Sequence, residues 1–425
     1  MSFYRYMKKI KHLLYYDWHL DIRAGGPPGY LANLRYGLDR IPNPEHFEIE
    51  LWALKKQPEN HKKSKWKDFI NNHRFLKYLS ANYFSKSGRR WFRNYVRFLK
   101  SIDDQLIQDE VIEKIKNENV KMVHCNYVID AIKVINTLKI KKIQNVKVIL
   151  TSHMPEAPSS ENYSLAIEMG YSEKKAIQFR KLWEHIEERA FCESDILIFP
   201  SKEAMEPYDD TLPNFKEWIK NKDVRYFQTG AKALETTKTK EELKKQFNVP
   251  ADKNIVVYIG RHNEVKGYDV LIEAGKKVLS TRDDTLFLVG GKANNLIPPP
   301  RNRNWRELGR INPAEVLKIA DVFILSNKRT YFDLILLEAM STGTPIIASN
   351  TGGNKSVQKA TDSLILYDGT SKDLEEKLTD FLNKSQEEKI ELSNKVLEAY
   401  KNNYTPEHFA QRYIDLMNEI YKDYE

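Results

Sequence analysis

Short runs of apolar and β-branched residues alternate along this chain with longer stretches in which charged and apolar residues recur at helical spacing. Such runs, bounded by Gly, Pro, Asn or Asp, are typical of strands that are buried on both faces. The predicted strands are Phe47–Leu54, Val120–Cys125, Val146–Ser152, Ile196–Ser201, Arg225–Gln228, Ile255–Gly260, Thr285–Val289, Val322–Ser326, Pro345–Ser349 and Ser363–Tyr367. Their alternation with helices predicts an α/β protein built on parallel sheets.

The chain divides around a charged stretch, Ala231–Lys253, which is typical of a junction between two domains. We predict one doubly wound domain over residues 1–235 and a second over 236–405. The remaining residues, 406–425, carry apolar side chains at helical spacing and are predicted to form a helix that docks on another element. Sheets of this kind bind ligands beyond the carboxyl ends of their strands, so the cleft between the facing domains is the predicted site.

Composition narrows the class of protein. The chain has 425 residues, 41% hydrophobic and 30% charged, as in a soluble globular protein. No apolar run approaches the roughly 18 residues of a spanning helix, and the N-terminus lacks the apolar core and cleavage site of a signal peptide. Cys125 and Cys192 make neither a disulfide framework nor a zinc cluster, so we expect a cytoplasmic protein.

The net charge of +9 is concentrated in one aromatic-rich stretch. Between His61 and Lys100 there are twelve Lys or Arg, one acid and ten aromatic residues. This pattern fits a solvated helix with its aromatics in the core, or a face that rests on an anionic membrane surface. Binding to RNA is a third reading, but no sequence signature of a nucleic-acid module accompanies the charge. We therefore predict no nucleic-acid partner.

Two glycine-containing segments suggest phosphate binding. Gly25 and Gly26 precede a helical pattern, where backbone N–H groups and the helix dipole can meet a phosphate, although a Pro-Pro-Gly sequence is also an ordinary turn. In the second half, a strand ends in Arg261, and Lys266 follows it at the start of a helix. Two fixed cations aimed into a cleft would suit a diphosphate, whereas solvated loop cations are the plain alternative.

A third segment places a carboxylate inside a predicted helix. The helix follows the strand that ends at Ser326, and Glu338 lies within it among apolar residues. Burial of this carboxylate would be costly without a polar partner, and a ribose diol could supply two hydroxyl donors. The start of the same helix would offer N–H groups to a phosphate.

These motifs together resemble a known family. The Gly-Arg and Lys-Gly pairs at 260–267, the Leu-Leu-Glu-Ala-Met and Gly-Thr-Pro-Ile-Ile-Ala-Ser block, and the Gly-Gly at 352–353 resemble family 4 of the retaining nucleotide-sugar glycosyltransferases (glycosyl transferases group 1), of the bacterial surface-polysaccharide type. The resemblance is specific from about Asn254 onward and looser before it. It implies the GT-B fold, with two Rossmann-like domains facing a central cleft, an N-terminal domain on the acceptor side, and a final helix that crosses back to it.

The resemblance also implies an activity and its partners. The enzyme would move a sugar, with retention, from a nucleoside diphosphate donor to a glycan or lipid-linked acceptor, in the cytoplasm or on the inner face of the cell membrane. The sequence contains no Asp-x-Asp signature, and the paired cations Arg261 and Lys266 could replace a divalent metal, so we predict metal independence and no cofactor. A catalytically degenerate partner subunit, a sugar-phosphate synthase and a phosphorylase remain alternatives, the last lacking a pyridoxal-lysine context.

Roles for individual residues follow from the same resemblance. Arg261 and Lys266 would stabilise the leaving diphosphate, and His153 would contact the donor sugar, although a plain loop histidine is the alternative. The donor-binding residues would be Gly25, Gly26, Thr330, Asp333, Leu334, Ile335 and Glu338. Thr330 stands where the family has its first glutamate, which would mean altered sugar preference, reduced activity or a non-catalytic protein. His124 is predicted to be structural.

Overall fold

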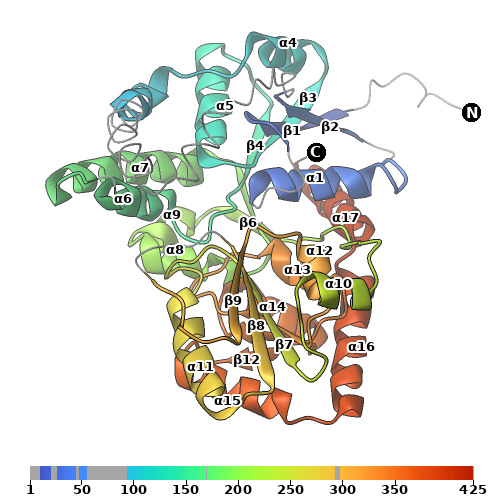
Figure 1. The fold of residues 1–425 in the computed structure, drawn as a ribbon. Helices are drawn as coiled ribbons and strands as arrows, with labels where there is room; N and C mark the ends of the chain where they lie inside the picture. Colours follow the sequence, from blue (N-terminus) through green and yellow to red (C-terminus); the bar gives the residue numbers. More distant parts are fainter. Residues whose placement is uncertain are drawn as a thin grey trace, which may run out of the picture.

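The fold consists of two parallel sheets, each accompanied by helices (Figure 1). The computed structural model describes residues 10–20, 26–44, 47–54, 93–168, 170–291 and 297–424. Within these residues each sheet has six strands, in the orders β2-β1-β3-β4-β5-β6 and β12-β11-β10-β7-β8-β9. All paired strands run parallel. The predicted α/β class with two doubly wound sheets is therefore confirmed.

The strands of the N-terminal sheet are β1 (Ile10–Tyr16), β2 (Phe47–Ala53), β3 (Val120–Cys125), β4 (Lys147–Thr151), β5 (Ile196–Phe199) and β6 (Asp223–Tyr226). Those of the C-terminal sheet are β7 (Asn254–Ile259), β8 (Thr285–Gly290), β9 (Trp305–Gly309), β10 (Val322–Leu325), β11 (Ile346–Ser349) and β12 (Ile365–Tyr367). The helices that accompany the first sheet are α1 (Pro27–Leu38), α4 (Asp109–Asn117), α5 (Val128–Ile140), α6 (Pro158–Glu168), α7 (Glu173–Glu193), α8 (Glu206–Thr211) and α9 (Phe215–Ile219). The later helices are α10 (Lys240–Gln246), α11 (Tyr268–Thr281), α12 (Pro313–Leu317), α13 (Leu334–Ser341), α14 (Gly352–Thr361), α15 (Ser371–Leu382), α16 (Gln386–Asn403) and α17 (Pro406–Tyr424).

Two strands, β1 and β9, were not predicted because polar residues interrupt their apolar pattern. β9 is an edge strand, in which Trp305 is buried and the other four residues are partly or fully exposed. β1 lies inside its sheet, yet it contains Lys11 and His12. His12 is fully buried, and its Nε2 lies 2.6 Å from the hydroxyl of Tyr413. A polar side chain is tolerated at a core position when it is hydrogen-bonded in this way.

The last helix, α17, packs on the N-terminal sheet, beside α1 (Figure 1). Its residues Phe409 and Met417 belong to the same hydrophobic cluster as Leu14 of β1. The hydroxyl of Tyr413 lies 2.8 Å from Nδ1 of His124 in β3. The apolar face of this helix is thus buried against the N-terminal sheet. The contact with Tyr413 gives His124 the structural role that was predicted for it.

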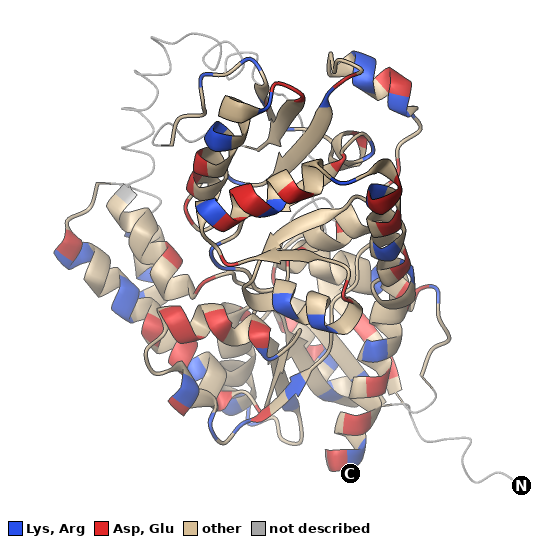
Figure 2. Cartoon of the chain, turned by 90° about the horizontal axis from the view of Figure 1, so that it is seen from below, with Lys and Arg blue, Asp and Glu red and all other residues tan. Residues whose placement is uncertain are grey.

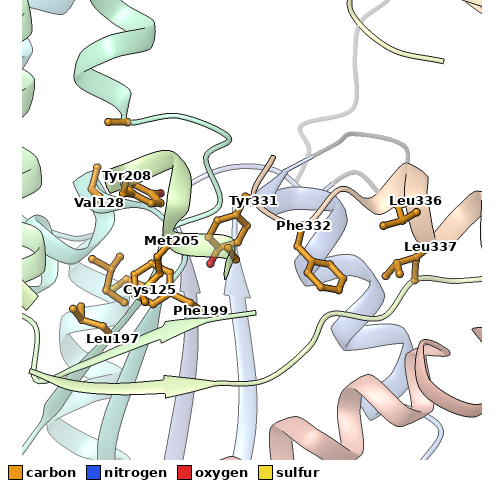
Figure 3. Close-up of a cluster of buried hydrophobic side chains, with 14 of the residues drawn as sticks. Cys125, Val128, Leu197, Phe199, Met205, Tyr208, Tyr331, Phe332, Leu336 and Leu337 are labelled. Carbon is orange, nitrogen blue, oxygen red and sulfur yellow. The ribbon is translucent and has the colours of Figure 1, made fainter. Parts of the chain in front are cut away.

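Tyr331 and Phe332 join the cores of the two domains (Figure 3). Both residues follow β10, and both are almost fully buried. The ring of Tyr331 lies 6.4 Å from that of Phe199 in β5 and 5.9 Å from that of His153, which follows β4. A loop of the C-terminal sheet is therefore anchored among the strand ends of the N-terminal sheet.

Charged side chains gather on the helices, whereas the strands are largely uncharged (Figure 2). Both signs of charge occur along the same helices, as in the exposed pair Arg35–Asp39 at the C-terminal end of α1. In the described part of the chain, no helix is long and apolar enough to span a bilayer. The predicted basic aromatic stretch lies mostly outside the described residues, and its described end, residues 93–100, is helical.

Candidate functional site

A cavity of about 610 Å³ lies between the two domains, at the carboxyl ends of their strands. In parallel sheets this edge is where ligands bind. The cavity brings together eight of the ten sequence-predicted site residues: Gly26, His153, Arg261, Lys266, Asp333, Leu334, Ile335 and Glu338. The N-terminal domain supplies the first two of these and the C-terminal domain supplies the rest.

Lys266 reaches the cavity from a tight turn before α11. Gly267 has a φ of +60°, and a Cβ at this position would lie 1.8 Å from the carbonyl oxygen of Ser326, so the turn requires glycine. The Nζ of Lys266 lies 2.8 Å and 3.1 Å from the two carboxylate oxygens of Asp333. The side-chain amide of Asn327 also donates to Asp333. These three polar side chains form one connected cluster in the cavity wall.

Arg261 enters the cavity directly after β7. Its side chain is 59% exposed, and its Nη1 lies 3.6 Å from Oε1 of Glu161 on α6 of the other domain. An exposed ion pair of this kind contributes little stability, so the guanidinium can turn toward a ligand at small cost. Arg261 and Lys266 are the two cationic side chains among the described residues that line the cavity.

The start of α13 also faces the cavity. Asp333 is the N-cap of this helix, but its side chain makes no capping hydrogen bond. The first backbone N–H groups of a helix have no partner within the helix, and its dipole favours an anion at this end. Leu334 and Ile335, the first two helical residues, line the cavity. Their backbone can therefore serve as a donor for anionic oxygens.

Glu338 lies one turn further along α13 and is half-buried. Within the described residues its carboxylate has no hydrogen-bond or ion-pair partner, and burial raises its pKa to about 7. A carboxylate that lines a cavity in this state is suited to ligand groups that donate hydrogen bonds to it.

His153 follows β4 and is packed between aromatic rings. Its ring lies 4.1 Å from that of Tyr30 on α1, and its Nε2 is 3.0 Å from Oδ1 of Asn126. Burial lowers the pKa of His153 to about 3, so the imidazole is neutral near pH 7. Because the proton on Nε2 is donated to Asn126, Nδ1 remains available as an acceptor.

Thr330 and Gly25 are the two predicted site residues that the cavity does not include. Gly25 lies outside the described residues. Thr330 is completely buried, and its hydroxyl has no partner within the described structure. Gly352, with a φ of +46°, packs so closely against Thr330 that a Cβ would lie 1.8 Å from the Thr330 carbonyl oxygen. A role of Thr330 toward a donor sugar therefore remains a prediction.

Other residues that line the cavity were not predicted from the sequence, among them Tyr30, Tyr331 and Glu161. Tyr30 and Tyr331 were given no role from the sequence, and only the apposition of the two domains brings them to the cavity. Glu161 lies in a mostly uncharged stretch, residues 158–168, with no motif around it. No pattern in the sequence marks these three, because their role depends on which loops face each other.

Adjacent acidic residues that could suggest a metal site lie elsewhere. Asp283 and Asp284 precede β8, at the amino end of the sheet, away from the cavity. Asp283 pairs with Arg303 and Asp284 with Arg282, each at 2.8 Å. Both ion pairs lie at the surface, where the side chains of Asp283 and Asp284 are 72% and 45% exposed, and the metal independence of the reaction stays a prediction.

Solved structures that are similar over nearly the whole chain define the class of fold. Sucrose-phosphate synthase from Thermosynechococcus elongatus has a TM-score of 0.60 at 15% identity, covering 98% of this chain and 100% of its own. Anabaena Alr3699/HepE, solved in complex with UDP and glucose, has a TM-score of 0.58 at 12% identity, covering 97% and 100%. The fold is the GT-B fold of two Rossmann-like domains.

The C-terminal domain adds evidence at the level of sequence. Residues 239–402 match the family model described as Glycosyl transferases group 1. D-inositol 3-phosphate glycosyltransferase of Corynebacterium aurimucosum is 27% identical over 193 residues, which are 39% of this chain and 45% of that relative. The match thus spans less than half the length of the curated relative. The C-terminal domain is therefore similar in sequence to proteins of this family.

Proposed function

We propose that this protein transfers a glycosyl group from a nucleoside diphosphate sugar to a hydroxyl of a glycan or lipid-linked acceptor, with retention at the anomeric carbon. One observation carries the proposal: a single cavity contains two cations, a helix start without a side-chain cap, and a carboxylate without a partner in the described structure. These groups suit the charge of a diphosphate, its oxygens and the hydroxyls of a ribose.

The side chains of the cavity suggest how the transfer proceeds. As the bond between the anomeric carbon and the diphosphate breaks, negative charge develops on the leaving oxygen, and Arg261 and Lys266 would stabilise it there. The acceptor oxygen bonds to the anomeric carbon on the same face, and the departing diphosphate can take the acceptor proton. His153, neutral and with Nδ1 free to accept, would orient a hydroxyl of the transferred sugar.

The test is a panel of nucleotide sugars incubated with the full chain, with release of nucleoside diphosphate as the readout and NMR of the product to assign the anomeric configuration. We expect release with one member of the panel, and we expect it to persist with a chelator. Release that needs a sugar phosphate as acceptor would favour a synthase, and turnover with inorganic phosphate would favour a phosphorylase. Nucleotide binding without any turnover would favour the alternative of a catalytically degenerate partner protein. That alternative was suggested by Thr330, which stands where the family has a glutamate.

Glu338 is expected to hold the ribose of the donor. Replacement with alanine should weaken nucleoside diphosphate binding by about 1.5–3 kcal/mol, the scale of a hydrogen bond to a charged group, as measured by calorimetry. Because ribose hydroxyls favour the ionised carboxylate, the affinity should also fall as the pH drops below the Glu338 pKa of about 7.

The matched control for this pH dependence is Glu338→Gln. Glutamine keeps the shape of the side chain and does not titrate, so the part of the pH dependence that belongs to Glu338 should vanish, leaving only the titration of the nucleotide itself. An alanine variant with undiminished affinity would show that the ribose is held elsewhere.

We further propose that the protein works in surface glycan synthesis, on the cytoplasmic side of an anionic membrane. Support comes from a groove of about 850 Å³ between residues 93–100 and α7. Its charged lining consists of Arg93, Lys100 and Lys175, and the described residues that line it include no acid. Apolar side chains such as Phe179 and Leu182 lie beside these cations. A cationic and apolar lining suits an anionic amphiphile.

Binding to anionic vesicles tests the membrane proposal. The protein should pellet with phosphatidylglycerol vesicles at low salt and be released at high salt, since each cation near the surface contributes about 1 kcal/mol and salt screens the attraction. Reversing the charge of Arg93, Lys100 and Lys175 together should reduce pelleting more than reversing the exposed Lys372 and Lys276 of the other domain. Equal pelleting with neutral vesicles would contradict the proposal.

A further inference from the structure

Both cations that would hold a diphosphate are already paired with carboxylates. Lys266 is bound by both oxygens of Asp333, at 2.8 Å and 3.1 Å, and Arg261 faces Glu161 at 3.6 Å. The first pair is the tighter one, because the side chains of Lys266 and Asp333 are only 16% and 18% exposed, whereas that of Arg261 is 59% exposed. The pair of Lys266 and Asp333 is therefore the more shielded of the two ion pairs.

Asp333 occupies the N-cap position of α13, but its side chain does not cap that helix. An aspartate at an N-cap usually accepts a hydrogen bond from the backbone of its own helix. Asp333 makes no such bond and reaches instead to Lys266, 67 residues earlier in the sequence. The amide of Asn327, itself buried, holds the same carboxylate from another direction. Two donors from different loops thus fix the carboxylate beside the helix start.

Acidic side chains outnumber cationic ones among the described residues that line the cavity, and Asp333 contributes to that excess. Among the described lining residues, the cations are Arg261 and Lys266, and the acids are Glu161, Asp333 and Glu338. A diphosphate carries at least two negative charges and would meet a like charge at Asp333. Juxtaposed like charges in a partly buried site are costly.

We propose that Asp333 sets the affinity of the site for nucleoside diphosphates by competing with them for Lys266. In the empty site the carboxylate holds the ammonium, and an incoming diphosphate must take Lys266 from it. The same competition favours release of the nucleoside diphosphate after transfer, because the carboxylate is in place to recapture the ammonium. This inference rests on the proposed function, and it identifies Asp333 as a residue that tunes donor and product affinity.

The test is calorimetry of UDP, ADP and GDP with the wild-type chain and with Asp333→Asn and Asp333→Gly. Asparagine is also a good N-cap and can still accept from Asn327, so this variant should fold. We expect both variants to bind the cognate nucleoside diphosphate about tenfold or more tightly than the wild type. In a Lys266→Ala background, where there is no ammonium to release, the gain from Asp333→Asn should shrink.

The control is Asp362→Asn, which removes a carboxylate 2.7 Å from Lys395 on the surface of the same domain and should leave the affinity unchanged. If the wild type binds a nucleoside diphosphate and both Asp333 variants bind it equally or more weakly, the competition is refuted while the proposed function stands. If none of the three nucleotides binds the wild type or either variant, the proposed function fails with it.

Discussion

Alanine at Lys266 or Arg261 is expected to lower turnover by about two to three orders of magnitude, the loss seen when one charge-stabilising donor is removed from a shielded site. Both residues line the cavity at the carboxyl edge of the C-terminal sheet, and each would face the leaving diphosphate from a different loop. Steady-state release of nucleoside diphosphate, followed under saturating donor, measures the effect.

A surface cation provides the comparison for these two variants. Arg303 also pairs with an aspartate of the C-terminal domain, at 2.8 Å from Asp283, but it is 77% exposed and lies outside the cavity. Arg303→Ala should keep wild-type turnover. Wild-type turnover in both Lys266→Ala and Arg261→Ala would place the leaving group elsewhere.

Tyr331→Ala is expected to lower the free energy of unfolding by about 3–5 kcal/mol, as for other buried aromatic residues truncated to alanine. The ring of Tyr331 contacts Phe199 and His153 of the other domain, so its loss leaves a void where the two cores meet. Denaturant unfolding followed by fluorescence gives the change in free energy, and turnover should fall too because His153 loses its packing partner.

Tyr331→Phe separates packing from hydrogen bonding at this position. The Tyr331 hydroxyl is buried without a partner in the described structure. An unpaired buried hydroxyl costs about 1–3 kcal/mol, so its removal should leave the stability unchanged or raise it. A large loss of stability in Tyr331→Phe would mean that the hydroxyl has a partner, such as a bound water.

The strands buried on both faces could be predicted from the sequence because they are short runs of mostly apolar residues. β10 and β11 are the plainest examples, since every residue in each strand is buried. β1 could not be predicted because the polar residue His12 occupies a core position. His12 is stabilised there by Tyr413, a partner 401 residues away in the sequence. No local pattern contains that information.

The candidate site likewise contains residues that could be predicted from the sequence and contacts that could not. Arg261 and Lys266 could be found because they stand beside a strand end and a helix start, and Glu338 because it is a carboxylate among the apolar residues of a predicted helix. The pairing of Lys266 with Asp333 could not, because it depends on the side-chain direction of an N-cap residue. The ion pair of Glu161 and Arg261 depends on how the two domains pack together, which cannot be predicted from any single segment of the sequence.

The docking of α17 has a consequence for how the chain is assembled. Its apolar face closes the core around β1, so that core stays open until residues 406–424 have been synthesised, after the entire C-terminal domain. During translation the first sheet would expose apolar surface of the kind that chaperones bind. A fragment that ends before Pro406 should expose the same surface and aggregate, and a separately supplied α17 peptide should restore its solubility.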